Sequence, residues 1–141
     1  MKLTVLAVGD VVGDAGIDYL ERRLPALKRL KAVDFTVVNG ENAAGSGILP
    51  RQAEAIFSAG ADVVTLGNHT WGKRQIIPLL DDNRYLLRPA NQAPQLPGRG
   101  WGVFECGKWR VGVLNLIGRC GMDFGPENPF TLADRILKEM D

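Results

Sequence analysis

Residues 62–71, DVVTLGNHTW, join a short apolar run to a glycine, an amide and the only histidine of the chain. The run at 62–66 predicts a buried strand. Asn68 and His69 follow it directly, and an amide beside an imidazole at the end of a core strand is unusual chemistry for a purely structural loop. This stretch is therefore one part of a candidate site.

Two further apolar runs end in polar loops of the same kind. Residues 3–8 lead into Gly9-Asp10, and residues 35–38 lead into Asn39-Gly40-Glu41-Asn42. Helical periodicity fills the segments between the runs, so strands and helices alternate over residues 1–88. This order predicts an α/β fold with a layered sheet of parallel strands.

The spacing of the three loops predicts that they meet. Positions 10, 41 and 68 are separated by 31 and 27 residues, each close to the roughly 30 residues of one βαβ unit. Parallel strands place their carboxyl ends on one edge of the sheet, where ligands of open α/β sheets bind. A single site is therefore expected to contain Asp10, Glu41, Asn42, Asn68 and His69.

Local signals predict the other elements. The strand at 3–8 is expected to be covered on both faces, and the next helix to be capped by Asp14 or Asp18 and kinked or broken at Pro25. Pro50 and Gly60 mark the start and end of a second helix. The last part of the chain predicts a short helix near 76–80, a strand at 85–87, a hairpin of 101–105 and 109–116, and a helix at 131–140 capped by Thr131.

Composition restricts the class of protein. The 141 residues carry 17 basic and 16 acidic side chains, and the net charge of +1 gives no reason to expect nucleic-acid or membrane binding through bulk charge. No apolar run approaches the roughly 20 residues that span a bilayer, and no cleavable signal is expected at the N-terminus. Cys106 and Cys120 lack zinc-type spacing, so we expect free thiols and a cytoplasmic location.

The donor chemistry of the expected cluster favours a divalent metal. Two carboxylates, two amides and an imidazole form a mixed oxygen and nitrogen set that suits manganese, iron or zinc. Carboxylates gathered at a partly buried edge repel one another, and a dication removes that cost. A dinucleotide-binding loop is one alternative for residues 9–13, but the GxGxxG spacing is absent and Asp10 would repel a pyrophosphate. A helix-capping role for Asp10, and plain polar turns in the other two loops, are the structural alternatives.

The loop sequences resemble the signature blocks of calcineurin-like metallophosphoesterases, and more closely those of their bacterial YmdB-like branch. Five blocks carry the resemblance in matching order: Gly9-Asp10-Val11-Val12-Gly13, Asn39-Gly40-Glu41-Asn42-Ala43-Ala44, Gly67-Asn68-His69-Thr70-Trp71, Arg88-Pro89-Ala90-Asn91 and Asn115-Leu116-x-Gly118-Arg119. That branch is associated with 2′,3′-cyclic-nucleotide 2′-phosphodiesterase activity. The resemblance implies a layered α/β/β/α sandwich, two divalent metal ions (Mn, Fe or Zn) and a small phosphodiester substrate.

The resemblance also implies roles for individual residues. Asp10 would bind the first metal, Glu41 would bridge both metals, and Asn68 would bind the second. Asn42 would lie in the metal shell or next to it. His69 would be catalytic without being a ligand, since it would protonate the leaving oxygen or stabilise the transition state.

Three residues outside the cluster are weaker candidates for substrate contacts. Arg88, Asn91 and Arg119 lie in the last two matching blocks, and a guanidinium can bind a phosphate. Loop-anchoring ion pairs are the alternative for the two arginines. Trp71 is expected to be a packing residue rather than a base-stacking one.

Family members continue well past this length, and their second half supplies three histidine ligands. Residues 1–141 are therefore expected to form a metallophosphoesterase domain that is truncated at its C-terminus and holds about half of the sandwich. Hydrolysis of 2′,3′-cyclic nucleotides or similar diesters is the first functional hypothesis, and a catalytically incompetent binding or assembly module is the second. A mononuclear hydrolase that uses Asp10, Glu41 and Asn68 is the third, and homo-oligomerisation is left open.

Overall fold

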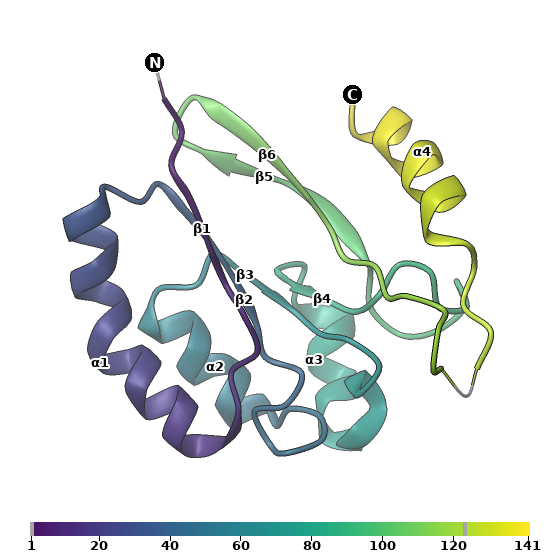
Figure 1. Ribbon diagram of the computed structural model, residues 1–141, viewed down its shortest axis with the longest axis horizontal. Coiled ribbons are helices and arrows are strands. Elements are labelled where there is room, and N and C mark those ends of the chain that lie inside the picture. Colours follow the sequence, from purple (N-terminus) through teal and green to yellow (C-terminus); the bar gives the residue numbers. More distant parts are fainter. Residues whose placement is uncertain (1, 123) are drawn as a thin grey trace.

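The computed structural model describes residues 2–122 and 124–141, and it confirms the predicted α/β fold. Four parallel strands form one sheet in the order β1-β2-β3-β4, and β5 and β6 form an antiparallel hairpin (Figure 1). The strands are β1 (Val5–Val8), β2 (Phe35–Asn39), β3 (Val63–Thr65), β4 (Leu86–Leu87), β5 (Trp101–Cys106) and β6 (Trp109–Leu114). The helices are α1 (Gly13–Lys31), α2 (Pro50–Ala59), α3 (Ile77–Asp82) and α4 (Pro129–Met140), with two 3-10 turns, η1 (Thr70–Gly72) and η2 (Arg74–Ile76), before α3.

Strand alternation gives the sheet two apolar faces, because successive side chains of a strand point to opposite sides. Val38 and Val64 belong to the larger core, which they share with apolar residues of α1, α2 and α3. Phe35 and Val63 belong to a second core with Phe104 of β5. The first three helices therefore cover one face of the sheet, and the hairpin covers part of the other (Figure 1).

β1 is an edge strand, and the prediction that both of its faces are covered is wrong. Within the described chain it pairs only with β2, in a register that aligns Val5 with Phe35. Leu6 and Val8 pack on the helical core, whereas Val5 is 48% exposed. The apolar sequence of this strand correctly predicts that the face under the helices is covered. The opposite face is left open because the hairpin does not extend over it.

The start of α1 differs from expectation. Its N-cap position is Val12, without a side-chain hydrogen bond, so neither Asp14 nor Asp18 caps the helix. Asp14 instead accepts a hydrogen bond of 2.9 Å from Gln52 Nε2, which joins α1 to α2. The helix also continues through Pro25, which is exposed, so water can reach the carbonyl that the ring leaves without a helical donor.

The later elements follow the predicted order with shifted boundaries. Pro50 and Gly60 mark the two ends of α2 as expected, and the hairpin ends at Leu114 rather than 116. α4 is capped by Asn128, whose side-chain oxygen accepts from Phe130 N at 3.0 Å, and not by Thr131. Among the described residues, no helix combines the length and apolarity that crossing a bilayer would need.

Candidate active site

The carboxyl ends of β1, β2 and β3 lie side by side, as the loop spacing predicted. Val11 N donates to Asn39 O at 3.0 Å, which joins the loop after β1 to the end of β2. Gly40 N donates to Thr65 O at 3.0 Å, which joins the loop after β2 to the end of β3. The three loops are thus held together by their own backbones.

Asp10, Asn42 and His69 form one hydrogen-bonded series across these loops. Asn42 Nδ2 donates to Asp10 Oδ2 at 2.7 Å, and Asn42 Oδ1 lies 2.6 Å from His69 Nδ1. An ionised carboxylate only accepts hydrogen bonds, so Asp10 fixes which end of the Asn42 amide faces the imidazole. The amide oxygen also only accepts, so Nδ1 of His69 carries its proton and Nε2 is the nitrogen left for chemistry.

The backbone of the second loop holds Asn42 in place. Gly13 N and Gly45 N both donate to Asn42 O, at 3.2 and 2.9 Å. Gly47 N donates to Glu41 O at 2.8 Å, with Gly47 at φ 90, in the left-handed region that favours glycine. The small residues that follow Asn42 in the sequence therefore form a tight loop that orients the two site residues before them.

Glu41 lies over the start of the third loop. Its backbone N donates to Asn39 Oδ1 at 3.0 Å, and its Oε2 accepts from His69 N at 3.3 Å. A Cβ at Gly67 would overlap both oxygens of the Glu41 carboxylate. Glycine at position 67 is thus what gives the carboxylate its place beside His69.

The donor set at this edge fits a hard divalent cation. Asp10 and Glu41 supply two carboxylates and Asn42 an amide, whereas Asn68 is exposed and makes no hydrogen bond to this series. None of the ion pairs among the described residues involves Asp10 or Glu41, so no lysine or arginine neutralises these carboxylates. In the same part of the chain no three His, Cys, Asp or Glu side chains lie close enough together to form a metal-binding group.

Arg88 anchors a loop. It is buried, and its guanidinium donates to the carbonyls of Pro97, Pro89 and Leu96 at 2.9, 2.9 and 3.2 Å. Burial lowers the pKa of the Arg88 guanidinium from its ordinary value. Its partners are backbone carbonyls rather than the acidic side chain of the ion pair considered from the sequence. These contacts occupy the guanidinium, so we do not propose that Arg88 binds the substrate.

Asn91 is also a loop clamp. Its amide nitrogen donates to Ile117 O and Glu127 O at 2.8 and 3.1 Å, and its amide oxygen accepts from Ile117 N at 3.0 Å. The side chain is only 1% exposed, which leaves it no surface for a substrate. Arg119 is exposed in the loop after the hairpin, and its substrate contact stays a prediction.

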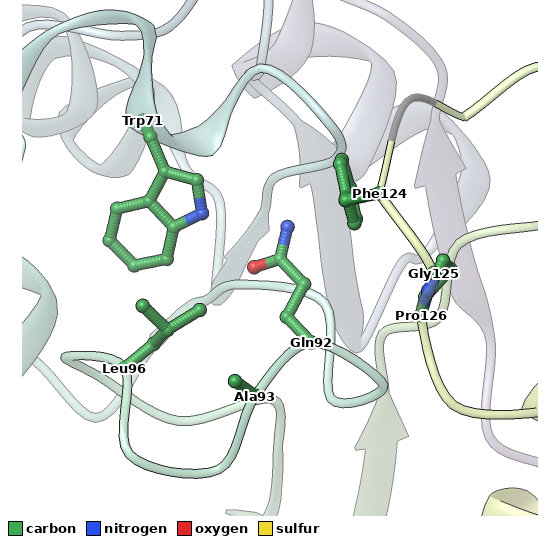
Figure 2. A pocket seen from close by; sticks show the side chains of 7 residues that line it. All are labelled: Trp71, Gln92, Ala93, Leu96, Phe124, Gly125 and Pro126. Carbon is green, nitrogen blue, oxygen red and sulfur yellow. The ribbon is translucent and has the colours of Figure 1, made fainter.

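Two structural residues were not singled out from the sequence. Asn115 Nδ2 donates to Leu66 O at 2.6 Å and to Leu87 O at 2.9 Å, which ties the end of the hairpin to the ends of β3 and β4. Gln92 is buried in a pocket of about 350 Å³ that Trp71 also lines (Figure 2). The available signal for Asn115 was its place in the last matching block, since the strand was expected to run to residue 116, whereas Gln92 had no comparable signal.

The structure gathers carboxylates, amides and an imidazole at the carboxyl ends of three neighbouring strands, as the resemblance of these loops to metallophosphoesterases implies. The chain belongs to the family described as YmdB-like protein, whose model matches residues 6–141. Over 140 residues it is 39% identical to the 2′,3′-cyclic-nucleotide 2′-phosphodiesterase of Bacillus subtilis (strain 168), and the match covers 97% of this chain and 52% of that protein.

Two crystal structures share the fold. A hypothetical protein from Thermus thermophilus superposes with a TM-score of 0.86 at 34% identity, over 96% of this chain and 52% of that one. A novel phosphatase from Mycoplasma pneumoniae superposes with a TM-score of 0.88 at 29% identity, over 99% of this chain and 52% of that one. The chain thus spans about half the length of the relatives it matches.

Proposed function

We propose that this chain supplies the metal- and diester-binding edge of a metal-dependent phosphodiesterase that acts on 2′,3′-cyclic nucleotides or similar small diesters. The observation that carries the proposal is the Asp10–Asn42–His69 series with the Glu41 carboxylate beside it. The substrate class comes from the Bacillus subtilis relative, a 2′,3′-cyclic-nucleotide 2′-phosphodiesterase.

The residues of the edge divide into metal donors and a proton donor. Asp10, Glu41 and Asn68 would hold divalent ions, manganese, iron or zinc, through carboxylate and amide oxygens, and Asn42, whose amide oxygen lies 2.6 Å from His69 Nδ1, would lie next to them. When bound, such ions activate a water and polarise the phosphoryl oxygens. Among the described residues, no lysine or arginine forms an ion pair with Asp10 or Glu41, and bound cations would neutralise these two carboxylates.

His69 is suited to protonate the leaving oxygen. Asn42 holds the Nδ1 proton, so the protonated imidazole can donate only through Nε2. Asp10 orients Asn42 and thereby the ring, so Asn42 is a positioning residue for His69. Breaking the bond between phosphorus and the 2′ oxygen would return a proton to that oxygen and leave a nucleoside 3′-phosphate.

The test is hydrolysis of 2′,3′-cyclic AMP in manganese, together with metal content by mass spectrometry. Turnover to the 3′-phosphate, with bound metal, is the expected result. A second candidate function, a catalytically incompetent binding module, is favoured by the partial donor set at this edge, where the described residues form no three-membered His, Cys, Asp or Glu group. Less than one metal per chain together with no turnover would support that second function.

His69→Ala is expected to lower turnover of the cyclic nucleotide by about 10²–10⁴-fold, the contribution of a positioned general acid, and to leave metal content unchanged. Bis-p-nitrophenyl phosphate provides a control, because p-nitrophenolate leaves without protonation. The loss should therefore be much smaller with that substrate. Loss of bound metal in the variant would show that His69 is a ligand and would contradict the role given to it.

A further inference from the structure

A second feature of the same edge is a buried amide without a partner. Gln92 is 7% exposed, and within the described chain its Oε1 makes no hydrogen bond. A buried amide oxygen without a donor costs free energy that folding does not recover. Gln92 lines a pocket of about 350 Å³, within the range of small-molecule sites, about 300–1,000 Å³.

The pocket is apolar apart from this amide. Trp71 lies on one side and Phe124 on the other, and the Gln92 amide points into the space between them (Figure 2). Leu96, Ala93 and Pro126 complete the lining, and no charged side chain contributes. Such a lining suits an uncharged, flat ring system and does not suit a phosphate.

Hydrogen bonds hold two sides of this pocket in place. Asn91 clamps the chain beside Gln92 to Glu127, next to Pro126, and Glu127 N donates back to Asn91 O at 2.8 Å. Arg88 holds the carbonyl of Leu96. A ligand would therefore not have to order the Leu96 and Pro126 sides of the pocket.

Trp71 packs against the helical core, as expected from the sequence, but it is only half-buried and also lines the pocket. We infer that this pocket takes the heteroaromatic base of the substrate, with its face against Trp71 and its edge on the Gln92 amide. Trp71 follows His69 by two positions, in η1, so the pocket adjoins the end of the third loop. The inference rests on the proposed function for the identity of the ligand as a nucleotide. It adds the residues that would bind the base of the nucleotide. The metal donors and His69 act on the phosphate and do not bind the base.

The amide selects among bases. Oε1 has no exposed surface while the pocket is empty, so pairing requires the Gln92 amide to turn. Once turned, Oε1 would accept from an exocyclic amine while Nε2 donates to the neighbouring ring nitrogen, the two-point pairing that glutamine makes with adenine. Stacking on an aromatic side chain adds affinity for any base, because every base has a π-face. Adenine and cytosine carry an amine beside a ring nitrogen acceptor, and they are the bases expected to bind best.

The test measures binding of adenosine, which has no phosphate, to the metal-free protein by NMR titration. Adenosine should shift the Trp71 indole N–H and the Gln92 side-chain amide, and purine riboside, which lacks the amine, should bind about 3- to 10-fold more weakly. Gln92→Ala should bind the two nucleosides equally. Gln95→Ala, an exposed glutamine of the same loop, should keep the wild-type difference.

Shifts confined to other residues, or an unchanged preference for adenosine in Gln92→Ala, would overturn the inference. The outcome is separable from the proposed function, because neither metal nor phosphate takes part. Adenosine binding without hydrolysis of cyclic nucleotides would contradict the proposed function and leave the base pocket standing. Hydrolysis of cyclic nucleotides with no adenosine-induced shift at Trp71 or Gln92 would support the proposed function and contradict the base pocket.

Discussion

Gly67→Ala is expected to weaken metal binding and turnover strongly while the fold is retained. The new Cβ would overlap the Glu41 carboxylate, which is the mobile end of a long side chain and can swing away. Gly67 is not among the glycines with positive φ, so alanine introduces no backbone strain. A misplaced group at a catalytic site can cost about 100-fold, so turnover and manganese affinity should fall by at least about that factor.

Gly9→Ala is the matched control for Gly67→Ala. Gly9 also lies just beyond a strand of the parallel sheet and precedes a proposed metal donor, Asp10, but a Cβ there meets nothing within 4 Å. Manganese titration of both variants measures the loss of metal affinity, and thermal unfolding of both measures any loss of stability. Equal manganese affinity in the two variants would contradict the position given to Glu41.

Gly100→Ala is expected to destabilise the whole fold. Its Cβ would overlap the Cα and N of Ala90, and backbone on both sides leaves no flexible group to move. Gly100 O also accepts from Asn115 N at 2.9 Å, so a shift would disturb the joint between sheet and hairpin. Overpacking costs about 1–3 kcal/mol and occasionally more, and we expect a loss of about 3 kcal/mol, near the upper end.

Denaturant unfolding measures this loss of stability, and Gly118→Ala serves as its control. Gly118 is exposed in the loop after the hairpin, and a Cβ there meets nothing within 4 Å. Its free energy of unfolding should stay within about 0.5 kcal/mol of the original. A Gly100→Ala protein as stable as Gly118→Ala would show that the hairpin does not pack on the sheet as described.

The spacing of strand-end residues predicted the convergence of the three loops. Asp10, Glu41 and His69 come together because parallel strands put every carboxyl end on one edge, whatever the side chains between them are. The hydrogen bonds that orient the side chains of this cluster could not be predicted from the sequence. Asn42 was predicted beside the metals, but its bridge from Asp10 to His69 depends on the path of the loop that follows it.

Two kinds of information were missing from the sequence. The apolar residues of β1 indicate a strand, but they do not say how many neighbours it has, and Val5 is exposed at the sheet edge. Arg88 and Asn115 bind backbone carbonyls, and Asn115 reaches Leu66 across 49 residues. Carbonyl partners carry no side-chain signature, so such clamps become visible only in the folded chain.

The central claim is that three loops form one metal-binding edge, and manganese-induced line broadening in an NMR titration tests it most directly. Manganese broadens the signals of nearby nuclei, so even a partial coordination shell reveals its place. We expect the amides of Asp10, Glu41 and His69 to broaden together at the lowest manganese concentrations, and Glu41→Gln to remove this common response. Broadening that begins at scattered surface carboxylates, or at one of these loops alone, would contradict the claim.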